Sequence, residues 1–198
     1  MIIQSIRLKG KNANIFVITT DEGQHILHSD IIVKFGLHTG EFDDEKFKLA
    51  EEESNVLIAT NDALKLLNQH MKTEKQVKDY LYKKEYKSKT VNAVINKLKE
   101  YNILNDNNFA QSYIRSNPSF SKRKLKQKLQ GFGIKEQDYS EDLCEIDELP
   151  ACVHEVEKFF KNKLPSKENT EKLTRRLVGQ GYSWDTIKQA MKNLIEED

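Results

Sequence analysis

The residues best suited to binding chemistry in this sequence are a run of cations between positions 122 and 128. Five of these seven residues are basic, namely Lys122, Arg123, Lys124, Lys126 and Lys128. Leu125 and Leu129 stand four apart in the same segment, which is the spacing of one buried helix face, so the cations must lie on the other faces. Such a surface can bind phosphates or the acidic side chains of a partner. The alternative, a solvated helix face without a partner, stays open.

Charge is distributed unevenly along the chain, although the net charge is only +1. Residues 71–135 hold 16 Lys/Arg against 5 Asp/Glu, whereas residues 136–157 hold 9 Asp/Glu and no Lys/Arg. This separation favours a charged polymer, or a protein with a complementary surface, as the partner. The acidic segment, expected as one helix from Glu136 to Glu148, either pairs with the basic helix or biases docking. Further cations that could extend the basic surface are Lys83, Lys84, Lys87, Lys89, Arg115, Arg175 and Arg176.

Motifs for catalysis and for metal binding are absent from the sequence. It lacks the phosphate-binding loop G-x-x-x-x-G-K-[ST], the zinc motif H-E-x-x-H, the nucleophile motif G-x-S-x-G and the redox motif C-x-x-C. Two groups of metal-type side chains match the spacing of no common site: His25, His28 and His38, and Cys144, Cys152 and His154. We therefore expect no enzymatic activity, no metal and no cofactor.

The cysteine content and the apolar runs indicate the compartment. The two cysteines form no disulfide framework, and apolar runs such as Ile15–Ile18 and Ile31–Val33 are too short for a membrane span or a signal peptide. We expect a monomer in the reducing cytoplasm, without a membrane partner.

A threefold internal repeat supplies the elements that would position these residues. The segments Lys75–Leu98, Arg123–Ile146 and Glu171–Leu194 align without a gap at a constant offset of 48 residues, and their apolar positions coincide. The spacing of those positions predicts two short helices joined by a tight turn, and apolar residues upstream of each copy predict a further helix. Because one such module cannot bury its apolar face alone, the modules should stack into an elongated array.

The expected fold class is therefore mainly α, with three tandem three-helix, helix-turn-helix-like repeats after a small antiparallel β region. The expected parts are a β region with an acidic connector at residues 1–55 and helical repeats at residues 56–107, 108–152 and 153–198. Short β-type runs predict strands at Ile2–Leu8, Asn14–Thr20 and Gln24–Leu27. Asp30 is expected to cap a short helix that ends at Gly36, and residues 41–53 should form an acidic helical connector.

Two positions depart from the pattern of the repeat. Gly133 and Gly181 stand where a positive φ would end a helix, but Glu85 occupies that position in the first module. If the turn has the same geometry there, the Glu85 side chain carries a backbone cost. Trp184 stands where the other copies have polar residues, so it either anchors a partner or covers the end of the array. We favour the second interpretation.

The helix-turn-helix pattern raises sequence-specific DNA binding as a rival function. In the second module, the helix after the glycine turn would carry four carboxylates: Glu136, Asp138, Glu141 and Asp142. Phosphates would repel these groups, so this helix is not expected to enter the major groove. The cations lie on the preceding helix, which suits backbone contacts that carry no sequence information.

Nearly the whole chain resembles the RecX family, the regulatory proteins of the RecA recombinase. The most specific residues are Leu104-Asn105-Asp106, followed by Phe109-Ala110 and Tyr113, and then Leu125, Leu129, Gly133 and Ile134. The chain departs from the family at Glu85, where glycine is favoured, and at His70-Met71-Lys72, where an arginine-proline stretch is common.

The resemblance implies a partner and a role in the control of recombination, DNA repair and the SOS response. The partner would be the RecA nucleoprotein filament on single-stranded DNA, whose ATPase, strand-exchange and coprotease activities the protein would lower. The resemblance implies no catalytic residues. A non-specific DNA-binding helical repeat, with weak direct contacts to DNA, is the alternative.

Overall fold

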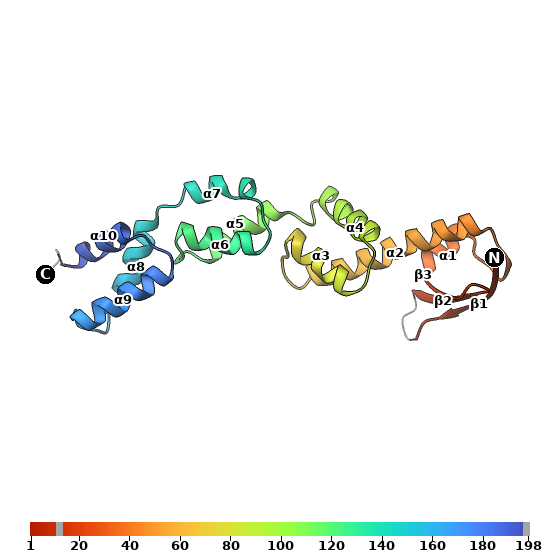
Figure 1. The fold of residues 1–198 in the computed structure, drawn as a ribbon, viewed down its shortest axis with the longest axis horizontal. Coiled ribbons are helices and arrows are strands. Elements are labelled where there is room, and N and C mark those ends of the chain that lie inside the picture. Colours follow the sequence, from red (N-terminus) through yellow and green to blue (C-terminus); the bar gives the residue numbers. More distant parts are fainter. Residues whose placement is uncertain (11–13, 196–198) are drawn as a thin grey trace. The chain divides into compact units, whose positions relative to one another are not determined.

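Helices dominate the computed structural model, which describes residues 1–10 and 14–195 (Figure 1). Contacts between residues divide the chain into two compact units. The first unit consists of residues 1–72 and 76–104, and the second consists of residues 73–75 and 105–198. In the described part of the chain, no helix is long and apolar enough to cross a membrane.

A small antiparallel sheet opens the first unit. Its strands are β1 (Ile2–Leu8), β2 (Ile15–Thr20), β3 (Gln24–His28) and β4 (Gly40–Glu41), in the spatial order β3-β2-β1-β4. The three strands predicted from sequence are confirmed, with ends that differ by one residue. The fourth strand was not predicted, because two residues are too short to show an alternating pattern.

Two helices pack against this sheet. They are α1 (Ser29–Phe35) and α2 (Asp44–Leu67), and their apolar residues complete a core with the sheet that includes Ile3, Ile18, Leu27, Ile31 and Phe47. Gly36 ends α1 with a φ of 63°, as predicted. The predicted capping role of Asp30 is wrong, because α1 begins earlier in the chain: His28 Nδ1 accepts the backbone N–H of Asp30 at 3.2 Å.

The acidic connector is the first half of α2, which continues without a break past residue 55 into the first helical module. Helices α3 (Glu74–Lys83) and α4 (Ser88–Glu100) complete that module. The apolar cluster of the module includes Ala63 from α2, Val77 and Leu81 from α3, and Val91 and Ile95 from α4. The long helix therefore contributes to two cores, that of the sheet and that of the first module.

The second unit contains two further helical modules. The first of them comprises α5 (Asp106–Ser116), α6 (Lys122–Gly131), a 3-10 turn η1 (Glu136–Asp138) and α7 (Ser140–Cys144). The other comprises α8 (Glu148–Phe160), α9 (Lys167–Gly179) and α10 (Trp184–Ile195), and each module has its own apolar cluster. The predicted repeat frame is confirmed at the leucine positions of α6 and α9, since Leu125, Leu129, Leu173 and Leu177 are all buried.

The prediction of a single acidic helix from Glu136 to Glu148 is wrong. The segment instead forms η1, the five-residue α7 and the first turn of α8, and Tyr139 between η1 and α7 is only 1% exposed. Carboxylates four residues apart repel one another along a helix, as the pair Glu141 and Glu145 would. The short elements place Tyr139 and Leu143 in the core without one long row of like charges.

The turn inside each module has the left-handed geometry that the glycines predict. The φ angles are 64° at Glu85, 81° at Gly133 and 90° at Gly181. A side chain in this conformation costs roughly 1 kcal/mol.

We therefore expect Glu85→Gly to raise the free energy of unfolding by about 1 kcal/mol. Urea unfolding followed by circular dichroism measures the change, and Glu85→Ala is the matched control, because it removes the carboxylate but keeps Cβ. Destabilisation by Glu85→Gly would contradict this account.

The two cysteines should differ in reactivity. Cys144 is exposed, whereas Cys152 is fully buried in the third module. Burial raises the pKa of the Cys152 thiol to about 11, and the nearby Glu148 and Glu155 act in the same direction. Only the thiolate reacts with alkylating reagents, so iodoacetamide at pH 8 should modify Cys144 alone in the native protein and both cysteines in urea. Mass spectrometry of the two peptides tests this, and rapid native labelling of Cys152 would be the contrary result.

Candidate functional site

Helix α6 carries the densest group of cations in the part of the chain that the structure describes. Its N-cap is Ser121, whose Oγ accepts the backbone N–H of Lys124 at 3.1 Å. Leu125 and Leu129 point into the core and leave the basic residues on the remaining surface. The first turn contains Lys122, Arg123 and Lys124 and no acidic residue, an arrangement that the helix dipole disfavours. Helix stability therefore does not account for these cations.

Two of the five cations hold the acidic segment that follows α6. Lys126 Nζ forms an ion pair with Glu136 Oε1, and this hydrogen bond raises the pKa of Lys126. Lys122 Nζ donates to the carbonyl oxygen of Cys144 at 3.1 Å, and the backbone N–H of Lys122 donates to Glu148 Oε1. The acidic segment thus pairs with the basic helix, which was one of the two alternatives that the sequence left open.

The other three cations line a basic groove. It has a volume of about 440 Å³ and lies between α6 and the end of α9, with Arg123, Lys124, Gln127, Lys128, Val178, Gly179 and Gly181 along its walls. The side chains of Arg123 and Lys128 are exposed and have no hydrogen-bond or ion-pair partner among residues 1–10 and 14–195. Lys124 Nζ lies 4.3 Å from the centroid of the Phe120 ring. These three side chains are therefore available to anionic groups.

A close contact between modules builds this groove. Ser121 Oγ donates to the carbonyl oxygen of Gln180 at 2.9 Å, so the start of α6 is seated on the turn that follows α9. A Cβ atom at Gly181 would lie 2.5 Å from Ser121 Oγ, which shows that the approach requires glycine. Sequence reasoning identified the glycine as a turn residue but missed its second role.

The same contact recurs 48 residues earlier in the chain, also within the second unit. Thr73 Oγ1 donates to the carbonyl oxygen of Phe132 at 2.9 Å, and a Cβ atom at Gly133 would lie 2.5 Å from Lys75 Cδ. One signal in the sequence could have revealed this contact between modules. Hydroxyl residues recur at 73 and 121, and glycines recur at 133 and 181, both at the repeat spacing.

The remaining predicted cations differ in whether their side chains form ion pairs or hydrogen bonds within the protein. In the first unit, Lys84 Nζ pairs with Asp62 Oδ2 at 2.8 Å, and Lys83 is exposed. In the second unit, Arg176 Nη2 pairs at 2.6 Å with Glu155, whose side chain is 5% exposed, so Arg176 serves the structure of its own module. Arg115 donates to the carbonyl oxygen and the side-chain oxygen of Gln111, both at 3.4 Å.

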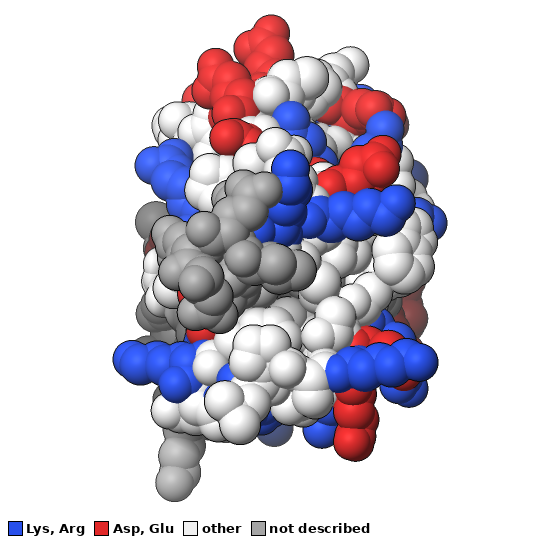
Figure 2. All heavy atoms as spheres, turned by 90° about the vertical axis from the view of Figure 1, so that its left-hand side faces the viewer, with Lys and Arg blue, Asp and Glu red and all other residues white. Residues whose placement is uncertain are grey.

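The third module presents a mixed surface. Arg175 is 79% exposed and pairs with Glu171 at 3.8 Å. Figure 2 shows acidic side chains beside basic ones on the face that carries α9 and α10, so this face is no single-sign patch. Trp184 begins α10 and is 60% exposed.

The described residues offer no group of three or more His, Cys, Asp or Glu side chains that could hold a metal ion. His25 Nδ1 contacts Glu51 Oε1 at 2.9 Å, and His28 caps α1. The basic groove, with its three cations, is the candidate site.

Comparison with known proteins places this chain in a family. The sequence model described as "RecX, first three-helix domain" matches residues 59–98. The regulatory protein RecX of Clostridium tetani is 32% identical over 197 residues, which cover 95% of this chain and 90% of that protein. The regulatory protein RecX of Bacillus subtilis is 31% identical, with coverage of 99% and 78%.

Two solved structures share the fold. A crystal structure of regulatory protein RecX superimposes with a TM-score of 0.70 at 19% identity and covers 96% of this chain and 98% of that one. RecX from Lactobacillus salivarius gives a TM-score of 0.63 at 24% identity, with coverage of 71% and 96%. Because relatives above 30% identity match along nearly the full length, the chain belongs to the RecX family of regulatory proteins.

Proposed function

We propose that this protein binds the RecA nucleoprotein filament on single-stranded DNA and lowers its ATPase, strand-exchange and coprotease activities. The observation that carries the proposal is the basic groove, where Arg123, Lys124 and Lys128 have no acidic partner among the described residues. A regulator without catalytic residues of its own must act through binding, and uncompensated cations provide the attraction to an anionic surface.

A filament presents the same anionic groups on every subunit, which suits a protein made of repeated modules. The proposed contacts are Arg123, Lys124 and Lys128 in the groove, with Lys83 and Arg175 as exposed cations of the other two modules. Several weak contacts on one chain can raise the overall affinity by orders of magnitude when they engage together. The division into a β region and three helical repeats at residues 56–107, 108–152 and 153–198 is part of this proposal.

Non-specific DNA binding is the second candidate function. The polar, cation-lined groove fits phosphate oxygens as well as carboxylates, and phosphate contacts would bind DNA without reading its sequence.

Binding to three targets distinguishes these functions. The targets are filaments assembled on oligothymidylate with a slowly hydrolysed ATP analogue, naked oligothymidylate, and the recombinase without DNA. We expect at least about tenfold tighter binding to the filament than to either component, and weaker binding as salt rises. Equal affinity for naked DNA and filament would reject the filament as the preferred partner and favour the DNA-binding function.

A further inference from the structure

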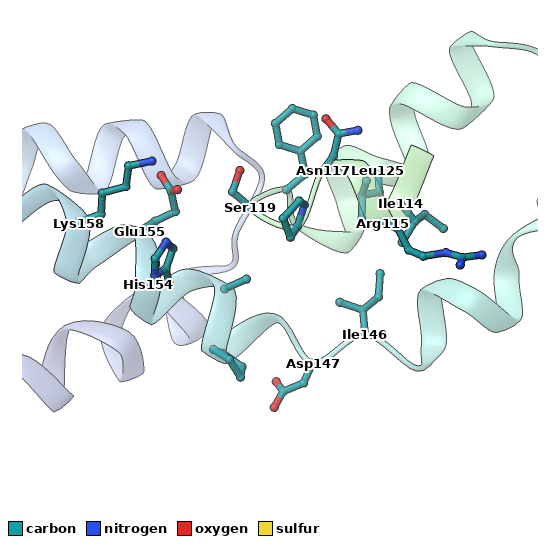
Figure 3. Close-up of a pocket in the computed structure, with 14 residues that line it drawn as sticks. Ile114, Arg115, Asn117, Ser119, Leu125, Ile146, Asp147, His154, Glu155 and Lys158 are labelled. Atoms are coloured by element: carbon teal, nitrogen blue, oxygen red, sulfur yellow. The ribbon is translucent and has the colours of Figure 1, made fainter. Parts of the chain in front are cut away.

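A second groove in the same unit differs in chemistry from the basic groove. It has a volume of about 640 Å³ and lies between the α5–α6 connection and α8 (Figure 3). Its apolar lining includes Ile114, Pro118, Phe120, Ile146, Pro150 and Ala151. These residues come from α5, the α5–α6 connection, the α7–α8 connection and α8 in the second unit, so the groove is formed by the packing of two modules.

The cations at this groove form no ion pair with the described residues, although Arg115 also lines a smaller pocket that includes Asp142 and Glu145. Figure 3 shows Arg115 at one end of the groove, and His154 and Lys158 on α8 at the other. Among the described residues, the Arg115 side chain donates hydrogen bonds only to the neutral Gln111, at 3.4 Å. His154 and Lys158 are exposed and have no hydrogen-bond or ion-pair partner within the described ranges. Both ends of the groove therefore carry basic side chains that form no ion pair with the residues that the structure describes.

The two carboxylates that line the groove already accept hydrogen bonds from other groups of the protein. Glu155 is 4% exposed and accepts hydrogen bonds from Arg176 and, at 3.4 Å, from Gln180. Asp147 accepts the backbone N–H of Leu149 at 3.0 Å as the N-cap of α8. Neither carboxylate forms an ion pair with Arg115 or Lys158, so these two carboxylates do not occupy the cations at the ends of the groove.

We propose that this groove binds a short segment of a protein partner, with apolar side chains at its centre and carboxylates on both flanks. Burial of the apolar side chains would supply affinity, and the cations at the two ends would select the acidic flanks. A protein segment fits better than nucleic acid, because the exposed surface of the groove is mostly apolar and Phe120, its one Phe, Tyr or Trp ring, already has Lys124 Nζ 4.3 Å from its centroid. Single-stranded nucleic acid would need open aromatic faces and a continuous row of cations.

This site is distinct from the basic groove but adjoins it. Phe120 lines the apolar groove, whereas Lys124, whose ammonium lies over the Phe120 ring, lines the basic groove. The proposal needs no recombinase and goes beyond the function proposed above, so it is tested on the isolated protein.

The probe is the fluorescein-labelled peptide Glu-Asp-Leu-Phe-Asp-Glu, and its control has serine in place of leucine and phenylalanine. Fluorescence anisotropy with the full-length protein measures both affinities. We expect saturable binding of the apolar peptide and at least about tenfold weaker binding of the serine peptide. No binding up to about 1 mM protein, or equal affinity for the two peptides, would overturn the proposal.

Charge reversal locates the binding site. The double variant Arg115→Glu/Lys158→Glu should weaken peptide binding at least about tenfold. The matched control Lys172→Glu/Lys188→Glu changes the net charge equally at exposed residues outside the groove and should have less than about a twofold effect. Circular dichroism checks that both variants fold.

An unchanged affinity in Arg115→Glu/Lys158→Glu, or an equal loss in both variants, would show that the peptide does not bind in this groove. Tighter binding of labelled oligothymidylate than of the peptide, lost in Arg115→Glu/Lys158→Glu, would assign the groove to nucleic acid instead.

Discussion

Gly181→Ala should lower the free energy of unfolding of the second unit by about 2–3 kcal/mol, which is a large fraction of the stability of a small domain. The φ of Gly181 is 90°, where a side chain costs about 1 kcal/mol. The new Cβ would also lie 2.5 Å from Ser121 Oγ and 3.3 Å from the backbone nitrogen of Lys124. The Ser121 hydroxyl must then move and lose its cap on α6 and its bond to Gln180, at a further cost of about 1 kcal/mol or more.

The matched control lies two positions earlier in the same turn. Gly179 is the last residue of α9, and a Cβ atom there would meet nothing within 4 Å. Gly179→Ala should therefore leave stability unchanged or raise it by up to about 1 kcal/mol, since alanine is the better helix former. Urea unfolding followed by the fluorescence of Trp184, the one tryptophan of the chain, reports on the unit that contains both sites.

A double-mutant cycle tests the contact itself. Ser121→Ala alone should cost about 1 kcal/mol through loss of the cap. The double variant Gly181→Ala/Ser121→Ala should cost less than the sum of the two single variants, because the hydroxyl that meets the new Cβ is gone. Additive costs would show that the close approach to Ser121 does not determine the requirement for glycine, and that the positive φ alone accounts for it.

Features that depend on short-range sequence pattern could be predicted. The apolar spacing of Leu125 and Leu129 identified a buried helix face, because helical periodicity is a local property of the chain. The left-handed turn at Glu85 was inferred from the glycines at the equivalent positions, and its φ of 64° agrees. The same reasoning placed the strands of the sheet within one residue at their ends.

Features that depend on tertiary contacts could not be predicted. The run of cations in α6 has a uniform appearance in the sequence, yet Lys126 pairs with Glu136 while Arg123 and Lys128 do not pair with described residues. That division depends on where the acidic segment turns, and it turns at Tyr139, whose burial interrupts the helix. The contact between Ser121 and Gln180 connects residues 59 apart in the chain, so short-range periodicity does not indicate it, and only the 48-residue repeat of hydroxyl and glycine positions could have done so.

This division of the α6 cations leads to a prediction about function. The triple variant Arg123→Glu/Lys124→Glu/Lys128→Glu should abolish inhibition of the recombinase's DNA-dependent ATPase, with a loss of affinity of about a hundredfold or more. Each of these side chains lines the basic groove, so reversal places three carboxylates against an anionic partner. Helicity should be retained, because Leu125 and Leu129 still fill the core and acidic residues in the first turn suit the helix dipole.

The contrasting variant is Lys122→Glu/Lys126→Glu, which reverses cations that bind the acidic segment of their own module. Here the new carboxylate at position 126 would face Glu136, so the thermal midpoint of unfolding of the variant should fall. Inhibition of the ATPase should be retained at a temperature where the variant is folded. ATP hydrolysis on circular single-stranded DNA, titrated with each variant, gives the two inhibition curves. The original expectation treated all five cations as one surface. Equal loss of inhibition in both variants would restore that interpretation, and full inhibition by the triple variant would show that the groove is not the docking surface.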